Sequence, residues 1–217
     1  MANFLSFIPL IQAAESGYQH YPNDSGNYNT QKELVGTNHG ISAKFYERYI
    51  GYPPSEQDMR NITKQEALNI FKQYFWDKLL ADQINSQAVA ETFVDMAINA
   101  GDRRAVKIMQ RVLNDYFNKN LQIDGIMGTK TLGAINSVNE AQLFELYNKA
   151  RENYYRSLSS FADWGRSWLR RIRILKNKFS NFFFDTQTQK VKKTNTGLVL
   201  FGIGLTIYFL TKKSNNE

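Results

Sequence analysis

Apolar side chains recur at helical spacing through most of this chain, and this pattern restricts its fold more than any other feature. The spacing predicts helices at residues 1–14, 43–50, 63–80, 89–100, 103–118, 129–135, 140–158 and 162–179. Thr63 and Glu66 add a capping-box pair at the start of the third helix. The sequence has no internal repeat, which excludes a solenoid. We therefore expect a mainly α-helical globular protein.

One segment near the N-terminus breaks this pattern. Residues 18–41 are rich in Asn, Asp, Ser, Gly, Thr and Tyr, as in the run Pro22-Asn23-Asp24-Ser25-Gly26. Such residues favour turns because they tolerate unusual backbone angles or bond to their own backbone. The segment predicts an irregular region or a short β-hairpin.

Charge and composition exclude several classes of protein. The 217 residues carry a net charge of +7, but residues 1–160 hold −1 and residues 161–217 hold +8. A chain that bound nucleic acid through its main body would carry the excess there, so we expect no nucleic-acid partner. There is no cysteine, which excludes a disulfide scaffold and a thiol nucleophile. His20 and His39 are the only histidines, and we expect no metal site.

The C-terminal part contains two distinct segments. Residues 164–178 place Trp164, Trp168 and other apolar residues opposite a basic face, which fits either a membrane-surface helix or the end of a globular module. Residues 194–211 are uncharged and flanked by lysines, and 18 helical residues just reach across the hydrocarbon core of a bilayer. This predicts a C-terminal transmembrane helix and a membrane-associated protein. The N-terminus lacks a basic region and contains Pro9 in its apolar run, so we expect no cleavable signal peptide.

Two carboxyl groups near the N-terminus are candidates for catalysis. Glu15 follows an apolar helix, and Asp24 lies in the polar turn region. Apolar surroundings keep a carboxyl group protonated, so that it can act as a general acid, whereas a hydrated carboxylate stays ionised and can activate water. Cleavage of a glycosidic bond requires such a pair. On spacing alone, a solvated helix-end charge and an ordinary turn residue are the favoured interpretation.

Three short motifs surround these groups: Glu15-Ser16-Gly17-Tyr18, Asp24-Ser25-Gly26 and Thr37-Asn38-His39-Gly40-Ile41. Together they resemble the N-terminal signature of glycoside hydrolase family 108. Members of that family are lysozyme-like N-acetylmuramidases of phage endolysins and of bacterial proteins formerly labelled secretion activators. The resemblance implies a lysozyme-like helical fold with the hairpin segment near its N-terminus.

The resemblance also implies roles for individual residues. Glu15 matches the catalytic acid, Asp24 would hold or activate the water, and Thr37 would help to position it. Tyr18, Asn38 and His39 would bind the sugar. The sequence departs from the family pattern at Ser16, which stands where Gly is usual, and in the longer loop from Gly26 to Thr37, which leaves Thr30 as an alternative to Thr37.

A second group of motifs resembles the predicted peptidoglycan-binding module that follows this catalytic region. It comprises Asp95 to Gly101, Arg104-Ala105, Gln110, Asp124 to Gly128, Thr131 and the closing stretch Trp164-Gly165, Trp168 and Arg170-Arg171. For the Asp124-Gly125-x-x-Gly128-x-x-Thr131 spacing, a tight turn and a helix cap are favoured over sugar contact. We expect a catalytic region at 1–90, a peptidoglycan-binding module at 91–175, and a basic linker with the membrane anchor at 176–217.

These observations predict a peptidoglycan hydrolase that cuts the β-1,4 bond between N-acetylmuramic acid and N-acetylglucosamine. An inverting course is expected by analogy with phage-type lysozymes, and no cofactor is expected because side chains can perform both proton transfers. The enzyme would act on the cell wall, from the periplasm or after delivery by a phage. The alternative is a membrane-anchored peptidoglycan-binding or structural protein with a decayed active site. The oligomeric state is not predicted.

Overall fold

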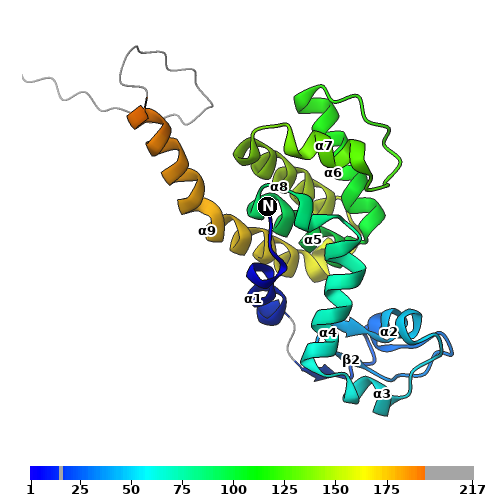
Figure 1. Cartoon of the computed structure of the whole chain (residues 1–217). Helices are drawn as coiled ribbons and strands as arrows, with labels where there is room; N and C mark the ends of the chain where they lie inside the picture. The colour runs from blue at the N-terminus through cyan, green and yellow to red at the C-terminus, as the bar shows by residue number, and fades with distance from the viewer. Residues whose placement is uncertain (15–16, 194–217) are drawn as a thin grey trace, which may run out of the picture. The chain divides into compact units, whose positions relative to one another are not determined.

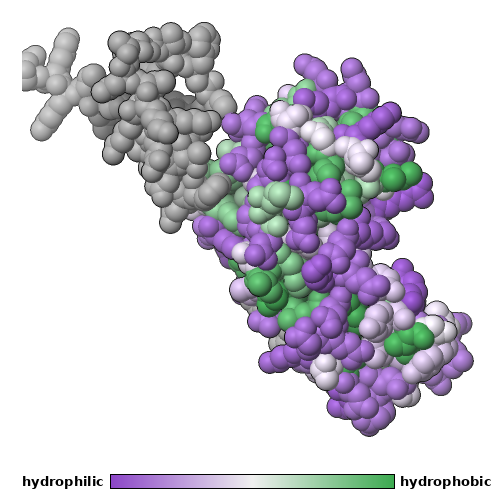
Figure 2. Space-filling model, viewed as in Figure 1, coloured by the Kyte–Doolittle hydropathy of each residue, from purple (hydrophilic) through white to green (hydrophobic). Residues whose placement is uncertain are grey.

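The computed structural model describes residues 1–14 and 17–193 (Figure 1). Residues 1–179 form one compact unit, and residues 180–217 are assigned to a second. The described elements are mainly helical, with one small sheet near the N-terminus, as the sequence predicts. Figure 2 shows a largely hydrophilic surface on which hydrophobic residues gather near α1 (Phe4–Ala14), where Leu5 is 69% exposed.

The polar segment folds into a three-stranded antiparallel sheet of order β1-β2-β3. The strands are β1 (Tyr18–Gln19), β2 (Thr37–Asn38) and β3 (Ile41–Ser42), and the turn η1 (Ser25–Asn27) lies between the first two. The predicted hairpin is the β2–β3 pair, and β1 adds a strand that the sequence did not predict. Val35 and Gly36 both donate backbone hydrogen bonds to Asn27 O, which holds the long loop against η1.

Two short helices follow the sheet. The first, α2 (Ala43–Ile50), has the predicted bounds. The second, α3 (Glu56–Asn61), was not predicted, because its sequence has no apolar periodicity. Ser55 and Asp58 form a reciprocal capping box at its start, which satisfies two backbone donors of the first turn.

The next predicted helix is divided in two. Residues 64–71 form α4 (Lys64–Phe71), and residues 72–77 form the π-helical turn η2 (Lys72–Asp77). Thr63 caps α4 by accepting a bond from Glu66 N at 3.1 Å, but the Glu66 carboxylate accepts from Tyr46 instead of closing the box. The wider π turn buries Trp76, whose Nε1 donates to Asp82 Oδ1 at 2.6 Å. After η3 (Ala81–Gln83) the chain enters the helical lobe.

The helical lobe is completed by an almost fully buried central helix and by four helices that follow it in the chain (Figure 1). They are α5 (Gln87–Ala100), which is that central helix, α6 (Asp102–Phe117), α7 (Thr129–Asn136), α8 (Glu140–Arg156) and α9 (Phe161–Lys193). α1 also joins this lobe, because Ala2 N donates to Ile84 O at 2.8 Å and Asn3 N donates to Gln87 Oε1 at 2.7 Å.

The first half of α9 packs onto the helical lobe. Ile172, Leu175 and Phe179 are buried, and Trp168 stacks on Tyr155 with ring centroids 5.0 Å apart. Of the two interpretations left open by the sequence, the globular one is correct for residues 165–179. Trp164 is the exception to the predicted stripe, because it is 51% exposed.

Ion pairs also hold α9 in place. Arg171 binds Asp95 at 2.5 Å, and Lys178 binds Glu91 at 2.7 Å. The Lys178 ammonium also donates to Ser6 O in α1 at 2.8 Å. α9 therefore contacts both the central helix and the first helix of the chain.

No helix among residues 1–14 and 17–193 has the length and apolar character needed to cross a membrane. Residues 194–211, where the sequence predicts a transmembrane helix, lie outside the described residues.

Candidate functional site

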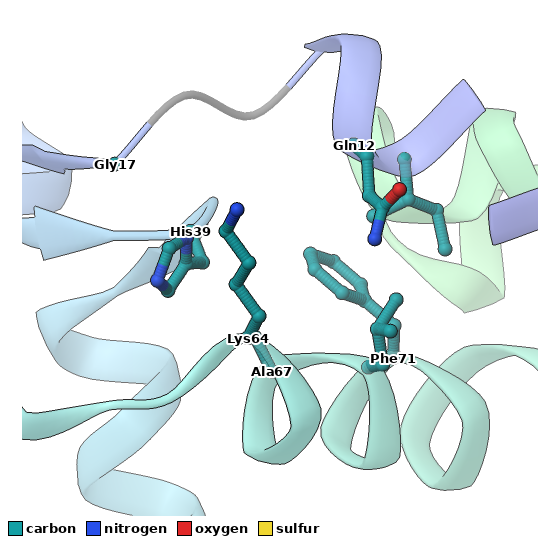
Figure 3. Close-up of a pocket in the computed structure, with 8 residues that line it drawn as sticks. Gln12, Gly17, His39, Lys64, Ala67 and Phe71 are labelled. Carbon is teal, nitrogen blue, oxygen red and sulfur yellow. The ribbon is translucent and has the colours of Figure 1, made fainter. Parts of the chain in front are cut away.

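A cavity of about 260 Å³ opens where α1, the β2–β3 hairpin and α4 meet, and we call it the hairpin cavity (Figure 3). Its lining comprises Ile11, Gln12, Gly17, His39, Lys64, Ala67, Leu68 and Phe71. Figure 3 shows His39 and the Lys64 chain on one side of the cavity and Gln12 on the opposite side. The cavity thus combines an apolar floor with a few polar groups, as small-molecule sites commonly do.

His39 owes its position to the hairpin turn. His39 and Gly40 have φ angles of +46° and +76°, the left-handed pair that a two-residue hairpin turn requires. Burial lowers the pKa of His39, and the nearby Lys64 ammonium lowers it further. The imidazole is therefore neutral at pH 7 and can donate or accept a hydrogen bond at the cavity wall.

Glu15, the predicted catalytic acid, lies outside the described residues. The cavity lining includes Gln12 and Gly17, which flank Glu15 in sequence. The role of Glu15 stays a prediction.

Asp24 is the cap of η1. Its Oδ1 accepts a bond from Gly26 N at 2.8 Å, and its side chain is half-buried. A Cβ added to Gly26 would lie 3.6 Å from Ser42 Cβ, so the Asp24 turn sits close to β3. This geometry fixes the Asp24 turn, and a catalytic role for its carboxylate stays a prediction.

Thr37 and the alternative Thr30 differ in their surroundings. Thr37 is 6% exposed in β2, and its hydroxyl has no hydrogen-bond partner among the described residues. Thr30, in contrast, uses its hydroxyl and its backbone N–H to bind the Glu47 carboxylate. Thr30 therefore anchors the loop to α2, whereas the Thr37 hydroxyl is buried and makes no hydrogen bond among the described residues.

Asn38 and Tyr18, two of the predicted sugar-binding residues, make contacts within the protein. The Asn38 amide donates to the carbonyl groups of Met59, Arg60 and Ile62 at 2.9–3.3 Å and is 4% exposed. Tyr18 donates to Val35 O, with the Arg60 guanidinium 3.9 Å from its ring centroid. Both residues therefore stabilise the sheet, and sugar binding by them stays a prediction.

A second pocket of about 410 Å³, which we call the aromatic groove, was missed by sequence reasoning. It lies between β3, α2, η2 and the end of α5, and its larger lining residues are Phe45, Arg48, Tyr74, Phe75 and Lys78. Phe45 lies 5.3 Å from both Tyr74 and Phe75, measured between ring centroids. The sequence signal was the crowding of four aromatic residues into positions 71–76, more than one helix face can bury.

The motif Asp124 to Thr131 is a structural unit. Gln110 of α6 donates to Asp124 Oδ1 at 2.9 Å and to Thr131 at 3.3 Å, and it accepts from Gly125 N at 3.0 Å. Gly125 has φ +79°, and a Cβ there would lie 2.6 Å from the Arg103 side chain. The turn interpretation is therefore confirmed for this motif.

The closing motif is also structural. Gly165 lets the Phe161 ring approach within 2.6 Å of where a Cβ would stand. Trp168 stacks on Tyr155, and Arg171 reaches the buried Asp95. These residues join α9 to α8 and α5.

Comparison with known proteins agrees with this architecture. Residues 8–101 match the family model of glycosyl hydrolase 108, and residues 104–172 match that of the predicted peptidoglycan domain. Among solved structures, SagA of Brucella abortus resembles this chain with a TM-score of 0.71 and 26% sequence identity, over 82% of this chain and 94% of SagA. A comparison with curated protein sequences gave no match.

The hydrolase region and the peptidoglycan domain follow one another directly, and their pairing supports a glycoside hydrolase that acts on peptidoglycan. Residues 8–101 are thus similar to the glycosyl hydrolase 108 family, and residues 104–172, which follow them, are similar to the predicted peptidoglycan domain.

Proposed function

We propose that this protein is a lysozyme-type muramidase, which cleaves the β-1,4 bond between N-acetylmuramic acid and N-acetylglucosamine. The observation that carries the proposal is the hairpin cavity inside the hydrolase region, because its lining includes residues on both sides of Glu15 in sequence. A general acid placed there would face a partly apolar pocket, which favours the protonated carboxyl form.

In this mechanism Glu15 gives its proton to the glycosidic oxygen as the bond to the anomeric carbon breaks. Asp24 takes the proton of the attacking water or stabilises the positive charge on the sugar. The unpartnered hydroxyl of Thr37 supports a role in holding that water. A neutral His39 suits this site, because it adds no charge that would repel the developing cation.

The aromatic groove suits a glycan strand. Its exposed ring surface can cover the apolar faces of pyranose rings, and Arg48 and Lys78 can donate to hydroxyl and acetamido oxygens. The groove shares Phe71 with the hairpin cavity. Sugars bound in the hairpin cavity and in the aromatic groove, on the two sides of the cleaved bond, would then lie next to each other.

The decisive experiment digests purified peptidoglycan and reduces the new ends with borohydride. We expect reduced N-acetylmuramic acid from the wild type and none from Glu15→Gln. Glu152→Gln is the matched control, because Glu152 lies on α8 and, within the described part of the chain, forms its ion pair with Arg156 on the surface. Equal release by Glu15→Gln would reject the catalytic acid, and reduced N-acetylglucosamine would reject the bond.

The second candidate function is binding of peptidoglycan without cleavage. It is favoured by one observation: Asp24 Oδ1 is already bonded to Gly26 N in the turn that precedes the lengthened loop. Retention on insoluble wall without release of any reducing sugar would establish this function instead.

Membrane association through residues 194–211 is proposed from the sequence alone. Flotation with lipid vesicles of the full chain, but not of a chain ending at residue 193, would support it. Equal flotation of both chains would reject it.

A further inference from the structure

A basic groove of about 410 Å³ lies on the helical lobe, next to the aromatic groove. It is formed by the first half of α6 and by α8, and its polar side chains are Arg103, Arg104, Lys107, Arg111, Tyr154 and Asp102. Its one acid, Asp102, is bound to Lys78. The four cations are therefore not neutralised within the groove.

The hydrogen-bond partners of Arg103 and Arg104 are neutral, although attraction to Arg103 contributes to lowering the pKa of the Asp124 carboxyl group. Arg103 Nε donates to the backbone oxygen of Asp124 at 3.4 Å, and Arg104 donates to the Tyr154 hydroxyl at 2.5 Å. Among residues 1–14 and 17–193, neither these two nor Lys107 and Arg111 form an ion pair. The nearby Glu152 pairs with Arg156 at 2.7 Å. The contacts orient the guanidinium groups but leave their charges available.

The positions of these cations work against helix stability. Arg103 and Arg104 occupy the first turn of α6, where the helix dipole favours negative charge. Arg103, Lys107 and Arg111 follow one another at intervals of four residues, which places like charges side by side. Such an arrangement is costly for the free protein and becomes favourable when an anion occupies the groove.

We infer that the basic groove binds the peptide stems of peptidoglycan through their carboxylates. This inference rests on the proposed function. The sugars of the glycan strand carry hydroxyl and acetamido groups, whereas the stems carry free carboxylates, so a cationic groove suits the stems. Arginine forks suit carboxylate oxygens in particular.

Length and position agree with this ligand. Arg104 and Arg111 are about 10 Å apart along the helix axis, a span that about three extended peptide residues cover. The basic groove and the aromatic groove share Gly101 and Asp102 in their linings. A glycan strand in the aromatic groove would therefore bring its stem to the cations of α6.

The test compares two triple variants of the full chain that lose the same charge. The groove variant is Arg104→Gln, Lys107→Gln and Arg111→Gln; Arg103 is kept because it packs on Gly125. The control variant is Arg166→Gln, Arg170→Gln and Arg173→Gln, three exposed cations of α9. Equal melting temperatures confirm that all proteins are folded.

Binding is measured by co-sedimentation with insoluble sacculi at about 0.15 M salt, where the Debye length is about 8 Å. We expect the groove variant to bind at least about tenfold more weakly, the effect of losing one charge-assisted hydrogen bond. The control variant should change less than about twofold. Equal weakening of both variants would overturn the inference, because it would indicate general charge attraction.

Sacculi stripped of stems by an amidase identify the ligand. On these we expect the wild type to bind as weakly as the groove variant, and a soluble muramyl tripeptide to displace the wild type from intact sacculi. Stronger displacement by poly(glycerol phosphate) would overturn the inference in favour of a phosphodiester polymer. A further weakening of the groove variant on stripped glycan would overturn it in favour of sugar binding.

Release of reducing ends is recorded in the same samples. Stem-dependent binding without bond cleavage would reject the proposed muramidase and leave the stem site in place. Bond cleavage with unchanged binding by the groove variant would reject the stem site alone.

Discussion

The buried carboxylate of Asp95 on α5 forms an ion pair with Arg171 on α9, with 2.5 Å between Oδ1 and Nη2. Its other oxygen binds Arg151 of α8, also at 2.5 Å. Arg151 is itself fully buried and donates to Thr92. One carboxylate of the stretch that matches glycosyl hydrolase 108 thus binds α8 and α9, whose arginines lie in the stretch that matches the peptidoglycan domain.

Removing this charge should destabilise the protein strongly. Asp95→Asn leaves two guanidinium groups without a counter-charge, and we expect a loss of about 3–5 kcal/mol in the free energy of unfolding. Chemical denaturation measures it. Glu152→Gln, which breaks an exposed pair, should cost less than about 1 kcal/mol. Similar losses for the two variants would contradict this account.

The Asp95 carboxylate should also make the free energy of unfolding depend on pH in the acidic range. Burial alone would raise the pKa of Asp95, but Arg171 and Arg151 outweigh it and hold the pKa below the ordinary value of 3.8. Its contribution is therefore complete above pH 3.8 and is lost as pH falls through the lower folded-state pKa. Asp95→Asn should remove this part of the acid dependence. An unchanged difference between wild type and variant down to pH 2 would be inconsistent with it.

Glu91, which lies one turn before Asp95, should have the opposite effect on the pH dependence of stability. Burial raises its pKa above 4.5, although Lys178 and Gln87 bind the carboxylate. A group with a raised folded-state pKa lowers stability as pH rises from its unfolded value through its folded value. Melting curves between pH 4 and 7 should therefore be flatter for Glu91→Gln than for the wild type. A steeper decline in the variant would show that the ion pair with Lys178 dominates.

Thr37→Val separates a catalytic role from a structural one. The Thr37 hydroxyl has no partner among the described residues, so an isosteric methyl group should leave stability equal or higher. If the hydroxyl holds the attacking water, kcat should fall by about 10²-fold, the lower part of the range for one positioned polar group. Full activity with full stability would exclude Thr37 from the reaction.

Tyr74→Ala tests whether the aromatic groove binds the glycan strand. Tyr74 is half-buried at the edge of the groove, against Phe45 and Tyr49. Loss of ring contact with sugars should raise KM about tenfold with little change in kcat, because a buried aromatic side chain contributes about 1.5–3 kcal/mol. Tyr116→Ala on α6, where the ring is 56% exposed, is the control. An equal KM for both variants would argue against glycan binding in the groove.

Most helices of this protein can be predicted from the sequence because they carry an apolar stripe, and some also begin with a capping side chain. Ser86 and Asn139, for example, accept bonds from the first turns of α5 and α8. The π turn of η2 is not readable, because it depends on how Trp76 fits into the core. Prediction missed α3 for another reason. Its start is marked by the capping side chains of Ser55 and Asp58, and its sequence has no apolar periodicity.

The candidate site can be predicted from the sequence only in part, and Asn38 shows why. Its motif predicts a residue at the hairpin, which is correct, but its amide is used by carbonyl groups of residues 59–62. Those partners are more than 20 residues away and become neighbours only when α3 folds against β2. Sequence motifs therefore locate the hairpin, whereas the free or occupied state of each side chain depends on tertiary contacts.

The bond from Lys178 to Ser6 O links positions 172 residues apart. A ribosome makes α1 well before Lys178, so the helix that leads to Glu15 gains this support only after residue 178 has been made. A nascent or truncated chain that ends before residue 178 lacks the contact. The order of translation itself thus delays completion of the hydrolase region until residues 104–172, which match the peptidoglycan domain, have been made.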